Sequence, residues 1–142
     1  MEKLSIKLLS NKATLPVKGT KDSAGFDIFS AQTVTIPPND QKLIRTGIIV
    51  KFPLGTYGRL TSRSGLCYNH KIIIPTGTID PDYTGELLVL VFNLGKDPFQ
   101  VKEKMRICQL ICEKASFPEV KQIDNLSPTI RNKKGFGSTG YF

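Results

Sequence analysis

Residues 87–93 read Leu-Leu-Val-Leu-Val-Phe-Asn and contain the longest purely aliphatic and aromatic run of the chain, Leu87 to Phe92. A short apolar run bounded by turn residues is typical of a strand. Because the run does not alternate with polar residues, we expect this strand to be buried on both faces. A membrane helix needs about 20 apolar residues, so the run is too short to span a bilayer.

Short segments on both sides of this run have the same extended character. Thr33 to Ile36 alternates with period two and stops at two prolines, as a strand ending in a turn does. Further strands are expected at residues 43–46, 48–52, 57–61, 71–74 and 107–113. No window supports a long amphipathic helix, and no repeat or linker divides the 142 residues. The pattern predicts a single all-β domain, a sandwich or jelly roll, over residues 1–126.

The segment from Ser127 to the end is polar and rich in glycine. It has few apolar side chains to bury, so we expect residues 127–142 to form a mobile C-terminal tail when nothing is bound.

The composition gives a formal net charge of +8. Three interpretations remain open, namely nucleic-acid binding, a solvated basic surface and the attraction of a small polyanionic substrate. Aromatic residues are sparse and do not alternate with the basic ones, as a stacking platform would require. Nucleic acid is therefore the partner that we expect least.

Three cysteines, Cys67, Cys108 and Cys112, form no CxxC pair, which argues against a disulfide framework or a zinc site. They suit apolar filling in a reducing compartment. The first eleven residues have no long apolar core and do not resemble a signal peptide. We expect a soluble intracellular protein, cytoplasmic or nuclear, without a membrane partner.

Three segments carry polar chemistry, and each has a structural alternative. In the tail, residues 135–140 interleave glycines with hydroxyls around Phe136, which suits phosphate binding through backbone N–H groups unless the tail is merely disordered. Residues 58–66 place Arg63 between two serines before a glycine, which is either a phosphate contact or an ordinary loop. Residues 77–85 put Asp80, Asp82 and Tyr83 on a turn, where the acids serve as a base for water or only cap backbone N–H groups.

Five segments resemble, in order and spacing, the five motifs of the trimeric dUTPase family, over about residues 16–140. They are 24–28 (Ala-Gly-Phe-Asp-Ile), 62–65 (Ser-Arg-Ser-Gly), 77–85 (Gly-Thr-Ile-Asp-Pro-Asp-Tyr-Thr-Gly), 106–110 (Arg-Ile-Cys-Gln-Leu) and 131–140. The resemblance implies a jelly-roll homotrimer with shared active sites. It also implies Mg²⁺-dependent cleavage of dUTP to dUMP and pyrophosphate.

The same resemblance implies a role for each matching residue. Asp80 would activate the water that attacks the α-phosphorus, and Tyr83 would pack on the deoxyribose and exclude a 2′-hydroxyl. Asp27 would support Mg²⁺ through metal-bound water. The remaining substrate contacts implied are phosphate contacts from Arg63, Ser64, Gly65, Arg131, Gly137 and Ser138, a polar contact near the α-phosphate from Gln109, uracil contacts from the backbone of Gly77 to Ile79, and an aromatic lid from Phe136.

Some positions depart from the family pattern. Lys104-Met105 stands where Gly-Asp is usual, Asn132 and Lys134 replace glycines in the fifth motif, and Thr61-Ser62 replaces Ala-Pro. Two related functions remain as alternatives. One is a non-catalytic nucleotide-binding or regulatory module of the same fold, and the other is a dCTP deaminase, which would not be expected to carry this tail.

Overall fold

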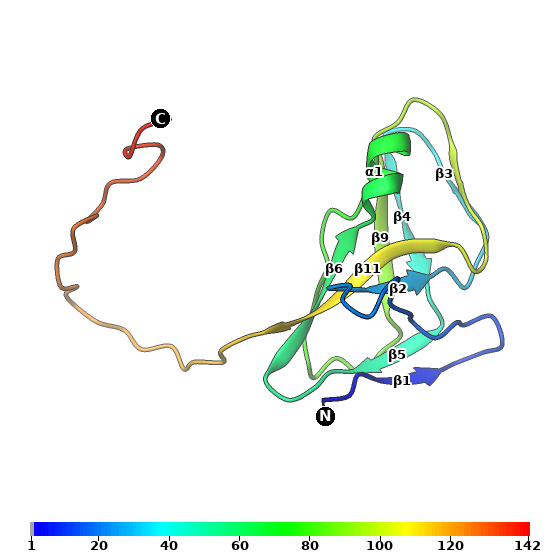
Figure 1. The fold of residues 1–142 in the computed structure, drawn as a ribbon, viewed down its shortest axis with the longest axis horizontal. Coiled ribbons are helices and arrows are strands. Elements are labelled where there is room, and N and C mark those ends of the chain that lie inside the picture. Colours follow the sequence, from blue (N-terminus) through cyan, green and yellow to red (C-terminus); the bar gives the residue numbers. More distant parts are fainter. Residues whose placement is uncertain (1) are drawn as a thin grey trace.

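The computed structural model describes residues 2–142 and consists mainly of strands (Figure 1). The elements are β1 (Ser5–Leu8), β2 (Phe26–Phe29), β3 (Val34–Ile36), β4 (Asp40–Arg45), β5 (Ile48–Lys51), β6 (Thr56–Ser62), α1 (Ser64–His70), β7 (Ile72–Ile73), β8 (Thr78–Ile79), β9 (Leu88–Asn93), β10 (Phe99–Val101) and β11 (Arg106–Lys114). The expected all-β, jelly-roll-like fold is confirmed. Strands β1, β2, β8 and β10 were not predicted from the sequence.

The strands form four antiparallel sheets whose neighbours come from distant parts of the chain. The largest has the order β2-β11-β6-β8, and a second has the order β4-β9-β7. Two strand pairs, β1 with β5 and β3 with β10, complete the body. This order puts β11, near the end of the body, between β2 and β6, so motifs far apart in sequence lie side by side.

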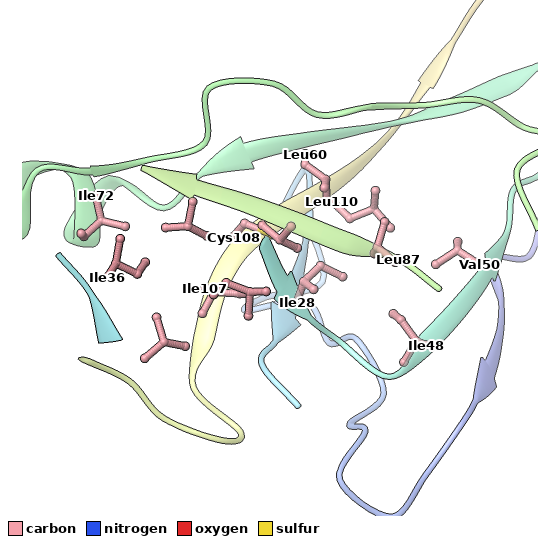
Figure 2. Close-up of a cluster of buried hydrophobic side chains, with 14 of the residues drawn as sticks. Ile28, Ile36, Ile48, Val50, Leu60, Ile72, Leu87, Ile107, Cys108 and Leu110 are labelled. Carbon is pink, nitrogen blue, oxygen red and sulfur yellow. The ribbon is translucent and has the colours of Figure 1, made fainter. Parts of the chain in front are cut away.

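The core is formed by side chains that alternate along the strands. In β9 the side chains of Val89, Val91 and Asn93 are buried, whereas those of Leu88 and Leu90 are only partly covered. The prediction that residues 87–93 are buried on both faces is therefore wrong for a single chain, because one face of β9 remains partly open. The hydrophobic core shown in Figure 2 includes Ile28, Ile36, Ile48, Val50, Leu60, Ile72, Leu87, Ile107, Cys108 and Leu110.

Asn93 ends β9, and both polar atoms of its buried side-chain amide make hydrogen bonds. Its Nδ2 donates to the carbonyl oxygens of Ile36 at 3.0 Å and Asp97 at 2.8 Å, and its Oδ1 accepts the N–H of Gly95 at 2.8 Å. A buried amide whose groups are all paired avoids the desolvation cost of unpaired polar atoms, so Asn93 is accommodated in the core and fixes the turn that follows.

The short helix α1 was not predicted from the sequence. It has no buried residue, so it lacks the apolar periodicity that reveals a helix. It ends at Lys71, which adopts a left-handed conformation with φ 56° and whose N–H bonds back to the carbonyl groups of Cys67 and Leu66. Within residues 2–142, no helix is long or apolar enough to cross a membrane.

After Lys114 the described chain has no further strand, and residues 116–142 are exposed throughout. Figure 1 shows this segment running away from the body. The exposed segment thus begins earlier than Ser127, where composition alone put the start of the tail. Its mobility remains a prediction.

Candidate active site

The first, second and fourth motifs meet on one sheet. Asp27 on β2 lies opposite Gln109 on β11, and Gln109 lies opposite Thr61 on β6. Because Cys108 and Leu110 on either side of Gln109 point into the core, Gln109 belongs to the outer face of the sheet. Directly opposed residues share a face, so Asp27 and Gln109 lie together there.

Asp27 is held by two arginines. Its side chain is only 7% exposed, and its Oδ2 lies 2.9 Å from Nη1 of Arg106, which donates a hydrogen bond. Its Oδ1 lies 3.3 Å from Nε of Arg63 but receives no hydrogen bond. Two cations therefore face one anion, and both guanidinium groups are partly exposed. This surplus of positive charge suits a polyanionic ligand.

The donor set around Asp27 limits how a metal ion binds. Within residues 2–142, no group of three or more His, Cys, Asp or Glu side chains is placed to hold a metal ion. Mg²⁺ requires few protein ligands, since it is commonly held by one or two carboxylates together with waters and substrate phosphates. Asp27, with one oxygen that accepts no hydrogen bond, fits such a site, in which the protein supplies an outer contact.

The second motif leads directly into α1. Arg63 precedes the helix with an extended backbone (φ −79°, ψ 128°), and no side chain caps the first turn. The first N–H groups of a helix have no partner within it, so those of Ser64 and Gly65 remain available to a ligand. An ideal Cβ on Gly65 would meet nothing within 4 Å, so this side of the turn is open. The ordinary-loop alternative does not describe this arrangement.

The third motif forms a turn at the edge of the same sheet, next to β8. Gly77 approaches β6 so closely that a Cβ would lie 2.6 Å from the carbonyl oxygen of Leu60, and its own carbonyl accepts the N–H of Leu60 at 2.8 Å. This close contact requires glycine. Beyond it lies a cavity of about 180 Å³ lined by Thr78, Ile79, Asp80, Tyr83 and Leu88.

Within this turn the acid and the ring are close in sequence and in space. The N–H of Tyr83 donates to the carbonyl oxygen of Asp80 at 3.1 Å, and the Tyr83 hydroxyl donates to the carbonyl oxygen of Glu86 at 2.8 Å. The carboxylates of Asp80 and Asp82 are exposed, and in residues 2–142 neither accepts a hydrogen bond from a backbone N–H. The alternative that they only cap the turn is therefore not supported.

One chain does not bring all these parts together. Asp27 is on β2 at one edge of the four-stranded sheet, and the turn with Asp80 follows β8 at the other. With β11 and β6 between them, the two edges are roughly 14 Å apart at the usual strand spacing. The tail is a third separate part, since residues 116–142 make no hydrogen bond or ion pair with residues 2–115. Its predicted site residues, Arg131, Phe136, Gly137 and Ser138, are all exposed.

Two departures from the family pattern, Lys104 and Asn132, keep a backbone conformation that favours glycine. Lys104 has φ 65° and donates its N–H to the carbonyl oxygen of Ser30 at 2.7 Å. Asn132 also has a positive φ, 47°, whereas Lys134 does not. Ser62, in place of proline, accepts the N–H of Ile74 at 2.9 Å. The turns at Lys104 and Asn132 are thus formed without the usual glycine.

Burial raises the pKa of the Cys108 thiol well above its ordinary value, and the charge of Asp27 raises it further. A thiol that stays neutral is a poor nucleophile, so Cys108 is a core residue and not a catalytic one. All three cysteines are free, as expected.

The model of the dUTPase family matches residues 11–140. The chain belongs to the dUTPase family. Among its relatives, the human mitochondrial deoxyuridine 5′-triphosphate nucleotidohydrolase is 46% identical over 132 residues, which are 93% of this chain and 52% of that protein. This chain therefore spans about half the length of the human relative. The fowlpox virus deoxyuridine 5′-triphosphate nucleotidohydrolase is 45% identical over 99% of both chains.

Solved structures of dUTPases have the same fold. The dUTPase of Staphylococcus bacteriophage 80alpha with dUPNHPP superposes with a TM-score of 0.92 at 33% identity, covering 98% of this chain and 99% of that one. A point mutant of the dUTPase from phage phi11 of S. aureus superposes with a TM-score of 0.83 at 30% identity, over 89% of this chain and 99% of that one. The structure of that phage protein reveals the coordination of a structural Mg(II) ion.

The sequence predicts no role for two residues near this candidate site. Arg106 is only the first residue of the fourth motif, and Glu86 lies outside the five motifs. The ion pair of Arg106 depends on the register between β2 and β11, which no local pattern reveals. The sequence marks Glu86 only as a charged residue that directly precedes the most apolar strand.

Proposed function

We propose that this member of the dUTPase family hydrolyses dUTP to dUMP and pyrophosphate, by attack of water on the α-phosphorus. The observation that carries the proposal is the turn in which the exposed carboxylate of Asp80 lies beside Tyr83 at a small cavity. The basic surface formed by Arg63 and Arg106 beside Asp27 would receive a triphosphate. The dUTPase relatives make dUTP the substrate to test first.

In this proposal Asp80 takes a proton from the attacking water as a general base. Its carboxylate is exposed and, within residues 2–142, accepts no hydrogen bond from a backbone N–H, so it can accept one from water. Gln109 would contact the α-phosphate or the water. Arg63 would bind phosphate oxygens as a fork donor, and the backbone N–H groups of Ser64 and Gly65 would add further donors.

The cavity beside the turn would hold the nucleoside. Backbone groups between Gly77 and Ile79 would read the pyrimidine edge, since a buried donor or acceptor left unpaired by a wrong base costs about 1–3 kcal/mol. The ring of Tyr83 would pack against the deoxyribose and leave no room for a 2′-hydroxyl.

The tail would complete the site after the substrate binds. Phe136 would cover the uracil, and Arg131, Gly137 and Ser138 would contact the phosphates. Ordering a tail costs about 1–2 kcal/mol per residue in backbone entropy, so it closes only when these contacts offset the cost. Closure would exclude water and align the triphosphate.

Mg²⁺ is the cofactor that we propose, with Asp27 as the residue that would hold it through water. What the ion supplies when bound is neutralisation of the phosphate charge. Asp27 would also hold the side chains of Arg63 and Arg106 close to the place where phosphates would bind.

We further propose a homotrimer in which each site uses parts of different copies. The separation of Asp27 from Asp80 within one chain supports this, and so does the open face of β9. On that face Leu90 lies opposite Leu43, which is 53% exposed, and Leu88 also lines the cavity beside Asp80. A second copy packed there would cover apolar surface and bring its own phosphate-binding residues to the cavity.

The three free cysteines suit a reducing compartment, the cytoplasm or the nucleus.

A non-catalytic nucleotide-binding module is not favoured, because the acid, the tyrosine and the glycine-rich tail are all present.

Pyrophosphate release from dUTP tests the function. The assay compares dUTP with dCTP, dTTP and UTP at equal concentration in the presence of Mg²⁺. We expect rapid release from dUTP alone. Cytosine would leave backbone groups unpaired, the methyl group of thymine would not fit a tight pocket, and a ribose would not fit beside Tyr83. Equal rates on all four nucleotides would rule out the uracil pocket, and no release from any would rule out the enzyme.

A further inference from the structure

The position of the Tyr83 ring depends on the two residues that follow Thr84. The hydroxyl of Tyr83 donates to the carbonyl oxygen of Glu86 at 2.8 Å, so the side chain folds back along its own turn. The ring therefore passes directly over Gly85, which lies between donor and acceptor in the sequence.

Gly85 leaves the space that the ring occupies. An ideal Cβ at this position would lie 2.5 Å from Oη, 2.7 Å from Cζ and 3.1 Å from Cε2 of Tyr83, and these are its three nearest atoms. Gly85 does not have a positive φ, so its backbone would accept an alanine. Glycine is thus needed here for the ring of Tyr83 and not for the turn itself.

The carbonyl that accepts the Tyr83 hydroxyl is itself fixed to the body. The Glu86 carboxylate accepts the N–H of Gly47 at 2.9 Å and forms an ion pair with Nη2 of Arg45 at 3.1 Å. The next residue, Leu87, donates its N–H to the carbonyl oxygen of Ile48 at 2.8 Å. The acceptor is therefore anchored to the β4–β5 corner, whereas residues 80–84 of the turn are exposed.

We propose that Gly85 and the Glu86 carbonyl are positioning groups that set where the Tyr83 ring lies in the cavity, and that they thereby set the selection of deoxyribose over ribose. The inference rests on the proposed function, in which Tyr83 packs on the sugar. A ring pushed off Gly85 would lie elsewhere relative to the sugar, and the space for a 2′-hydroxyl would change. Neither group needs to touch the substrate.

The test measures kcat/KM for dUTP and for UTP, with the full chain and Mg²⁺, in wild type and three variants. Gly85→Ala should lower the dUTP-to-UTP ratio by on the order of tenfold or more, the scale at which one misplaced methyl-sized contact changes discrimination in a pocket. Tyr83→Phe keeps the ring and removes its hydrogen bond to the Glu86 carbonyl oxygen. The dUTP-to-UTP ratio should fall by about two- to tenfold, which corresponds to the free energy of one ordinary hydrogen bond. Thr84→Ala, exposed and between the two, is the matched control and should leave the ratio unchanged.

The outcomes separate this inference from the proposed function. If wild type does not hydrolyse dUTP, the proposed function fails. If wild type prefers dUTP and folded Gly85→Ala keeps the full preference, the positioning role is wrong. A uniform loss on both nucleotides in Gly85→Ala would also contradict it, because it would indicate general damage. Should Gly85→Ala fail to fold, Tyr83→Phe decides, since it introduces no added atoms, and an unchanged ratio there overturns the inference.

Discussion

Nη1 of Arg106 lies 2.9 Å from Oδ2 of Asp27, which joins β11 to β2 through a buried carboxylate and a half-exposed guanidinium. Because Asp27 is 7% exposed and also faces Arg63, the pair differs from a surface salt bridge. Removing one partner leaves a buried charge with poorer compensation. This relationship holds the proposed phosphate-binding residues in place before any ligand arrives.

Arg106→Gln should therefore destabilise the protein by about 2 kcal/mol, the scale of a hydrogen bond to a charged group. Chemical denaturation measures the free energy of unfolding. Arg59→Gln is the matched control, since Arg59 pairs with Glu113 in the same sheet, with both side chains more exposed than Asp27. The control should cost less than about 1 kcal/mol. Equal losses in the free energy of unfolding would mean that the burial of Asp27 does not strengthen its pair with Arg106.

Lys104→Gly should stabilise the protein by about 1 kcal/mol, because a side chain in the left-handed region carries a steric cost that glycine avoids. Lys104 has φ 65°, and its N–H bond to Ser30 would remain. The thermal midpoint reports the change. Lys102→Gly, without a positive φ, should instead be neutral or destabilising. A loss of stability in Lys104→Gly would contradict the strain that we infer.

How much the sequence reveals depends on the range of the interaction. Alternation along residues 33–36 and the apolar run at 87–93 predicted strands, because these signals are local. Strand β2 was not predicted because its residues, Phe-Asp-Ile-Phe, do not alternate and include an aspartate, which is depleted in strands, and α1 because it has no buried residue. The contact between Asp27 and Arg106, 79 positions apart, depends on strand register. The partly open face of β9 could not be told from a buried one, since both are apolar.

Removing residues 131–142 should leave stability unchanged and reduce turnover on dUTP by on the order of 100-fold, the effect of losing alignment of the reacting groups. The segment makes no hydrogen bond or ion pair with residues 2–115. Steady-state kinetics and thermal unfolding measure the two effects. Phe136→Ala should reduce turnover less than the truncation does. Phe142→Ala, which changes an equally exposed residue outside the family match, should leave turnover unchanged. Full activity in the truncated protein would exclude the lid.

Chelation of Mg²⁺ should abolish hydrolysis without unfolding the protein. In residues 2–142 no group of three or more acids, histidines or cysteines is placed to hold a metal ion, so we expect the fold to survive removal of Mg²⁺. Pyrophosphate release and the thermal midpoint are measured with and without EDTA. A large drop of the midpoint in EDTA would indicate a structural metal and contradict this account.

We propose that Asp80 and Arg63 of one active site come from different copies of the chain. Asp80→Asn should by itself lose about 10²–10⁴-fold in rate as a missing general base, and Arg63→Gln should weaken phosphate binding. Each homotrimer is then poorly active for a different reason. Coexpression of the two variants with distinct tags, followed by tandem purification, yields mixed trimers in which some sites receive both intact residues.

The decisive measurement is the rate of pyrophosphate release by these tandem-purified mixed trimers. When each site draws the two residues from different copies, one site in every mixed trimer is intact, so the preparation regains roughly a third of wild-type activity. When both residues act within one chain, every site lacks one of them, and verified mixed trimers stay as inactive as their parents. Recovery is the result that we predict, and its absence would contradict the shared site.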